Sequence, residues 1–320
     1  MDTTPLAQAL NQLFTAYPFL KTICDALCII VPLSALTAFA GLDFMSAVAK
    51  ILAVVRNRST FDKCARQLAF LCVVLGWILL VGSRVWLYLD HPAKDPNTVD
   101  YYIIEIGWIL LSIGVLLASV YCVLWKVLRN LPILHTTIGM ISAVQCVIST
   151  VAILAAIRVI NAIHSSNAPN LSIPDIFPAT WPSPVWSACA YTVPLLFAMP
   201  AAWAAVWLPT RRKKDDFGRD YYNTMVAWCA RWARNAWLAL WLLLLASCAF
   251  QLWTDYGHNA FNEQNAILEG LRILLWLIPV LLWTIVARSS LTLRHKGGLW
   301  LALALASCFM LPYFFEITGA

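Results

Sequence analysis

Charged residues are scarce in this sequence: Asp, Glu, Lys and Arg make up 12% of its 320 residues, whereas ordinary globular domains carry about 25%. Glycine-rich phosphate loops, HExxH motifs, GxSxG motifs and paired-carboxylate patterns are absent, so nothing predicts phosphoryl transfer or hydrolysis. The net charge of +6 does not form a basic soluble face, which excludes nucleic acid as an expected partner. Polar segments long enough for a soluble domain are also missing.

Apolar residues make up most of the chain, in place of the charged and polar residues that it lacks. They form 61% of the chain, and the mean hydropathy is +0.74. A helix needs about 18–20 largely apolar residues to cross the hydrocarbon core, and eight such runs occur, at roughly 22–48, 65–89, 102–125, 132–162, 185–208, 225–253, 266–288 and 298–317. The sequence therefore predicts an all-α polytopic membrane protein with eight transmembrane helices in a lipid bilayer.

The basic residues are distributed unevenly over the predicted connections. Most of the 22 Lys and Arg residues fall on one side of the eight runs, and most of the 16 acidic residues fall on the other. The positive-inside rule places the basic side in the cytoplasm. We expect a multi-pass protein of the inner (cytoplasmic) membrane with both termini on the outer, periplasmic side. The spacing of Leu6, Leu10, Leu13 and Phe14 predicts a short helix on the membrane surface before the first span.

Short sequence matches indicate an internal duplication with a constant spacing of about 164 residues. The tripeptide VPL occurs at 31–33 and again at 193–195, and CAR occurs at 64–66 and again at 229–231. An aliphatic residue followed by Glu occurs at 104–105 and again at 268–269. Each half would hold four helices, so the two repeats would enter the membrane from the same side. We predict two parallel-repeat four-helix bundles, at 1–163 (with the N-terminal interfacial helix) and 185–320, joined by an outer loop at 164–184. Convergence between similar helix pairs is the alternative.

Charged side chains within membrane spans are costly, so each is a functional hypothesis. Four candidates for handling protons or quinol lie toward the outer leaflet, namely Glu105, Glu269, Arg272 and Glu316. Arg272 follows Glu269 by three residues on one helix face, which predicts an ion pair. The alternative is charge pairing near the interface, with long Arg stems extended toward the headgroups.

Histidine and cysteine give little support for a bound metal or haem. Among the five histidines only His135 falls within a span, so it is a weak candidate for a haem ligand, and no pair of histidines on two helices is available. The ten cysteines show no C-x-x-C or Cys/His metal spacing, and we expect them to act as small buried apolar residues without a metal. Asp43, toward the inner end of the first span, has no evident partner.

Five short motifs resemble those of subunit I of the cytochrome bd quinol oxidases. They are VPL at 31–33 (FVPLT in the family), IE at 104–105 (IEGL), GRD at 218–220 (GRDF), LRIL at 271–274 (FRIM), and LP at 311–312 followed by Glu316 (LPW and a Glu). The resemblance implies a fold of paired four-helix bundles with haem and quinol chemistry near the outer face. The family's haem ligands are a His in the first span, a His in the fifth and the Met of FRIM. Here both His are absent, and Leu274 replaces the Met. The ninth span is also absent, and the long quinol-binding loop shrinks to 254–265.

The resemblance implies a haem-depleted relative of the oxidase subunit. It would be an integral membrane subunit of a respiratory or electron-transfer complex, with a partner membrane or cytochrome subunit. Quinone is the one cofactor expected, near the outer leaflet, and haem is not expected. Glu105 and Glu269 would relay protons, and Arg272 would keep one of them ionised. Whether the chain is itself an enzyme stays open. Two alternatives remain: a non-enzymatic scaffold or assembly subunit, and a small-solute transporter.

Overall fold

The computed structural model describes residues 12–89, 98–128, 130–165, 172–178, 184–257 and 263–319. Over these residues the chain is helical, without strands, and eight of its helical segments are long and apolar enough to cross a membrane. The predicted fold class is confirmed. The long helices are α2 (Pro18–Val55), α3 (Ser59–Leu89), α4 (Val99–Val123), α5 (Pro132–Ser165), α7 (Pro184–Asp215), α8 (Arg219–Gly257) and α9 (Glu263–Arg288). The eighth segment combines η1 (Thr292–His295), α10 (Lys296–Phe309) and α11 (Leu311–Thr318).

Several helices extend beyond the apolar runs that mark them in the sequence. The run at 22–48 becomes the 38-residue helix α2, and the run at 225–253 becomes the 39-residue helix α8. At 1.5 Å per residue such helices are about 57 Å long, well beyond the hydrocarbon thickness of about 30 Å. Hydropathy detects only the part of a helix that lies in hydrocarbon, whereas backbone hydrogen bonding continues into the polar interface.

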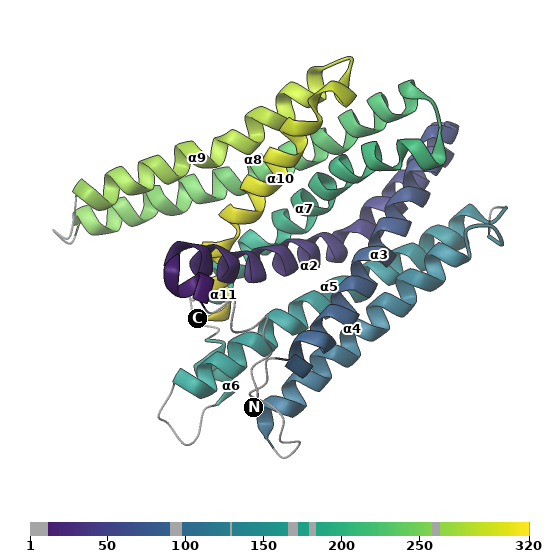
Figure 1. The fold of residues 1–320 in the computed structure, drawn as a ribbon. Coiled ribbons are helices and arrows are strands. Elements are labelled where there is room, and N and C mark those ends of the chain that lie inside the picture. Colours follow the sequence, from purple (N-terminus) through teal and green to yellow (C-terminus); the bar gives the residue numbers. More distant parts are fainter. Residues whose placement is uncertain are drawn as a thin grey trace.

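The helices form two groups along the chain (Figure 1). In the first group α2 packs on α3 and α5, and α4 packs on α3 and α5; in the second, α7 packs on α8, α8 on α9, and α10 on α7 and α9. Helices α2 and α7 pack against each other in the middle, so α4 and α9 lie at opposite edges of the molecule (Figure 1). The internal duplication and the orientation in the membrane stay predictions from the sequence.

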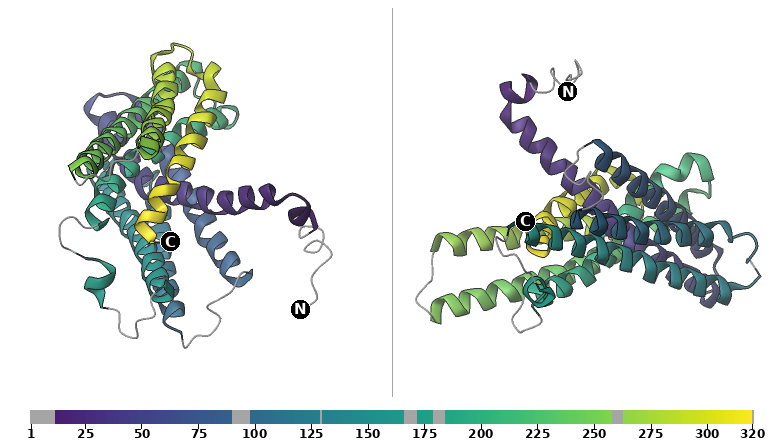
Figure 2. Two further views of the ribbon diagram at one scale, coloured as in Figure 1. Left: turned by 90° about the vertical axis from the view of Figure 1, so that its left-hand side faces the viewer. Right: turned by 90° about the horizontal axis from the view of Figure 1, so that it is seen from below.

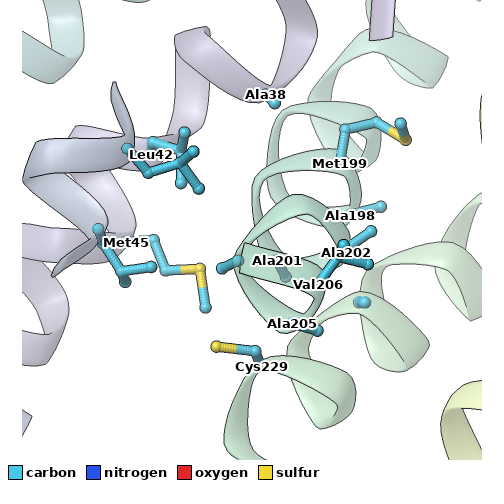
Figure 3. Packing of buried hydrophobic residues seen from close by; sticks show 14 of the residues in the cluster. Ala38, Leu42, Met45, Ala198, Met199, Ala201, Ala202, Ala205, Val206 and Cys229 are labelled. Atoms are coloured by element: carbon cyan, nitrogen blue, oxygen red, sulfur yellow. The ribbon is translucent and has the colours of Figure 1, made fainter. Parts of the chain in front are cut away.

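Small residues allow the two groups to approach closely at the α2–α7 contact. Ala201 of α7, which is 0% exposed, points toward Leu42 and Met45 of α2 (Figure 3). A Cβ at Gly41 would overlap the carbonyl oxygen of Leu196 and lie 2.5 Å from Pro200 Cγ. Close backbone approach through small residues is a common way to pack helices in lipid, where no hydrophobic force draws them together.

Hydrogen bonds between the two groups add to this packing. Ser34 and Ser307 share a hydrogen bond of 2.8 Å between their hydroxyl oxygens, and Trp203 Nε1 donates to Ser34 Oγ at 2.9 Å. At the other end of the molecule, Gln67 Nε2 donates to Asp215 Oδ2 at 2.6 Å. Polar side chains that bond across helices fix the rotation of each helix about its own axis.

Two predicted boundaries need comment. The connection at 164–184, expected to be a loop, contains the short helix α6 (Ile173–Ile176), because Ser172 and Asp175 form a reciprocal capping box. Of the predicted interfacial helix, Leu6 and Leu10 lie outside the described residues, and residues 12–16 are helical.

Candidate functional site

Arg84 and Glu105 form a two-pronged ion pair between α3 and α4. Arg84 Nη1 donates to Glu105 Oε1 at 2.5 Å, and Nη2 donates to Oε2 at 2.9 Å. The guanidinium carbon lies 4.4 Å from the ring centroid of Trp108, one turn after Glu105. Parallel hydrogen bonds of this kind are the strongest Arg–carboxylate geometry, and the indole face adds a cation–π contact. Both residues lie near the ends of their spans, and the sequence did not reveal that they pair.

A groove of about 1020 Å³ opens beside this ion pair. Arg84, Glu105 and Tyr101 lie toward its polar end, and Trp77 and Leu116 line it deeper in the span. The Glu105 side chain retains 20% exposure, so its carboxylate is reachable from the groove even while it is paired. Such a shape suits a ligand with a polar aromatic head and a long hydrocarbon tail, because pockets bind through apolar walls and use a few polar groups for orientation.

The predicted ion pair between Glu269 and Arg272 is confirmed on α9. Arg272 Nε lies 3.1 Å from Glu269 Oε2. Cys248 on α8 joins this pair, since its Sγ donates to Glu269 Oε2 at 3.3 Å and accepts from Arg272 Nη2 at 3.8 Å. The pair therefore lies at the α8–α9 contact, where the Arg272 side chain is 40% exposed and the Glu269 side chain 32% exposed.

The structure does not bring the predicted site residues into one cluster. Glu105 lies on α4 and Glu269 on α9, at opposite edges of the molecule (Figure 1). The backbone of Glu316 belongs to α11, and its side chain lies outside the described part of the chain. Arg158, in the C-terminal part of α5, donates to the carbonyl oxygens of Ile176 and Ile317, both at 2.9 Å. Its role in the structure is to hold the end of α11.

His135 is packed among aromatic rings at the start of α5. It is 1% exposed, and its Nε2 lies 3.2 Å from the carbonyl oxygen of Tyr121. The Tyr121 ring stacks on the imidazole at 4.6 Å between centroids, and Trp125 packs edge-on at 4.5 Å. The imidazole thus belongs to an aromatic cluster, its Nδ1 is buried without a hydrogen-bond partner among the described residues, and a role as haem ligand stays a prediction from the sequence.

Asp43 is the carboxylate that the sequence left without a partner. It is fully buried in α2, and Ser142 Oγ on α5 donates to its Oδ2 at 2.5 Å. Cys72 and Cys146, from α3 and α5, are close to it. A signal was present in the sequence, because polar Ser142, Cys146, Ser149 and Thr150 recur on one face of α5, but a single helix does not show which neighbour that face meets.

Comparison with known proteins adds information on the fold. No protein family matches the sequence, and no curated protein is detectably similar to it. Among solved structures, a chain of the bd oxidase from Geobacillus thermodenitrificans superposes with a TM-score of 0.58 over 92% of this chain and 86% of that one, at 12% identity. The chain has a bd oxidase-like fold. The similarity in fold agrees with the sequence resemblance.

Proposed function

We propose that the chain is a haem-depleted, bd-like membrane subunit of an electron-transfer complex, which binds a quinol in the groove between α3 and α4. The observation that carries the proposal is the Arg84–Glu105 pair at the polar end of an apolar groove. A quinol hydroxyl would donate a hydrogen bond to Glu105 while the two hydrogen bonds from Arg84 hold that carboxylate in place. The apolar walls would hold the isoprenoid tail at the depth of the lipid chains.

The proposed subunit works with a second membrane chain that carries the haem. No His occurs in the first or fifth span, and Leu274 stands at the position of the family's Met ligand. The five motifs resemble subunit I, but the short 254–265 connection fits a subunit that accompanies a haem-binding chain. Electrons from the quinol would pass to that chain, and Glu105 would accept a proton released from the quinol.

Quinone content of the purified protein tests the proposal. Quinone is extracted from detergent-purified protein and quantified by mass spectrometry. We expect about one quinone per wild-type chain and at least fivefold less quinone in E105Q. The neutral amide accepts a hydrogen bond from the quinol hydroxyl less well than the carboxylate, and it no longer forms an ion pair with Arg84. E269Q is the matched control, since Glu269 is also ion-paired but does not line the groove.

Three outcomes would refute the quinol site or the haem depletion. Equal quinone in wild type and E105Q refutes the role of Glu105, and a phospholipid in place of quinone refutes the ligand. A stoichiometric pyridine haemochrome signal from the purified chain refutes haem depletion. As a functional readout, native membranes of E105Q should lose quinol-dependent electron transfer.

A second candidate function, an assembly subunit, is supported by the first half of α2. This segment projects away from the other helices (Figure 2), and Phe19, Ile23 and Leu27 on it are each about half exposed. An isolated helical arm gives a partner membrane subunit a face to pack on. Deletion of the gene should then abolish assembly of a partner complex on native gels, while E105Q assembles it normally.

A further inference from the structure

A buried cluster lies in the interior of the first helix group, away from the quinol groove. It consists of Asp43 on α2, Cys72 on α3 and Cys146 on α5, each 0% exposed. One carboxylate oxygen and the two sulfurs all lie within 4.8 Å of one another. Three side chains that can each donate an electron pair thus converge from three separate helices.

The carboxylate shows that this cluster has unused bonding capacity. Asp43 Oδ2 accepts a hydrogen bond from Ser142 Oγ, but Oδ1 is buried and has no hydrogen-bond partner among the described residues. A buried carboxylate oxygen that has neither a cation nor a donor beside it is costly, and such groups are normally paired or bound to a metal. The Lys nearest along α2, Lys50, is engaged with Asp62. A cation at the cluster would satisfy the free oxygen.

We propose that Asp43, Cys72 and Cys146 bind one zinc ion that joins α2, α3 and α5. Two thiolates favour a borderline-soft ion such as Zn²⁺ over the oxygen-seeking Ca²⁺ and Mg²⁺, and carboxylate oxygen is also a normal zinc ligand. Zinc–sulfur bonds of about 2.3 Å and zinc–oxygen bonds of about 2.0–2.2 Å in a tetrahedron set ligand separations of roughly 3.5–3.8 Å. The three ligand atoms now lie within 4.8 Å of one another. To reach the tetrahedral separations they would have to approach one another by about 1 Å.

The surroundings assign roles to the neighbouring groups. Binding displaces the protons of the two thiols, which pass to the solvent, because only thiolates bind the metal. Ser142 orients the carboxylate through its hydrogen bond to Oδ2, so Oδ1 is the oxygen directed to the ion. Three protein ligands leave one tetrahedral position for a fourth ligand.

Metal analysis of the full-length protein in detergent tests this site. After loading with zinc and washing with a mild chelator, we expect about one zinc per chain by mass spectrometry. D43N and the double variant C72S/C146S should each retain at least fivefold less. The matched control is C64S/C229S, because Cys64 and Cys229 are also fully buried thiols but, within the described part of the chain, do not form such a cluster with a carboxylate.

Cobalt substitution keeps the test valid if a variant fails to fold. Wild-type protein loaded with Co²⁺ should show thiolate-to-cobalt charge-transfer absorption and the intense visible bands of a tetrahedral site. Absence of both zinc and the cobalt spectrum in wild type overturns the proposal. A Cys72–Cys146 disulfide in protein purified under reducing conditions also overturns it, as does equal zinc in D43N and C64S/C229S. The quinone measurement on E105Q is independent of all these results.

Discussion

The contact between α2 and α7 leads to a quantitative prediction about Gly41→Ala. In an ordinary helix this change stabilises, by about 0.5–1 kcal/mol, because alanine has the higher helix propensity. At position 41 the new methyl group would overlap the carbonyl oxygen of Leu196 and lie 2.5 Å from Pro200 Cγ. A backbone oxygen cannot rotate away as a side chain does, so the two helices must separate.

The size of the effect follows from these two opposing contributions. Overpacking a well-filled contact costs about 1–3 kcal/mol, and the backbone obstacle at position 41 puts the cost near the upper end. After the gain in helix propensity, the net loss is about 2 kcal/mol. An unfolding entropy of about 2.1 cal/mol/K per residue gives about 0.7 kcal/mol/K for 320 residues, so each kcal/mol shifts the unfolding midpoint by about 1.5 °C. The midpoint of Gly41→Ala should therefore fall by about 3 °C.

Thermal unfolding in detergent, followed by the loss of the monodisperse peak in size-exclusion chromatography, measures this effect. Gly82→Ala and Gly270→Ala are the matched controls, because an added Cβ at either position meets nothing within 4 Å. Both controls should melt at or slightly above the wild-type temperature. A Gly41→Ala variant as stable as these controls would refute the close α2–α7 approach, and with it the packing of the two helix groups.

Two further predictions concern other contacts. Gly139→Ala should lower stability by about 1–3 kcal/mol, because its Cβ would lie 2.8 Å from the Tyr121 ring and push that ring against its neighbours; Gly107→Ala, with no atom closer than 3.8 Å to its Cβ, should be neutral in the same melt. Arg158→Ala should loosen the C-terminal helix, since each lost hydrogen bond from a charged group, such as that to the Ile317 carbonyl, is worth about 1.5–3 kcal/mol. Limited proteolysis should then remove a C-terminal tag at least several-fold faster from Arg158→Ala than from the wild type. Arg158→Lys, which keeps one charged donor, should be cleaved at a rate between those of the wild type and Arg158→Ala. Identical cleavage of all three proteins would contradict the anchoring role.

Helical periodicity predicts contacts within one helix but not contacts between helices. The Glu269–Arg272 pair was predictable, because residues three apart on one helix are always neighbours. The partner of Glu105 was not predictable, since Arg84 lies on another helix whose register against α4 is set by packing. For the same reason the Asp43 cluster was missed: its members come from three helices, and no local spacing marks it as the C-x-x-C pattern would.

The sequence by itself determined the class of this protein and the course of its chain. Apolar residues make up 61% of the chain and form eight long runs. In lipid, runs of this length form helices, because a helix satisfies its backbone hydrogen-bonding groups internally. Tertiary structure alone decided which polar groups meet. It separated Glu105 from Glu269, placed Arg158 at the end of α11, and buried Asp43 between two thiols. The physical reason is that the hydrophobic pattern fixes each helix but not its rotation, which depends on small residues such as Gly41 and on side-chain bonds between helices.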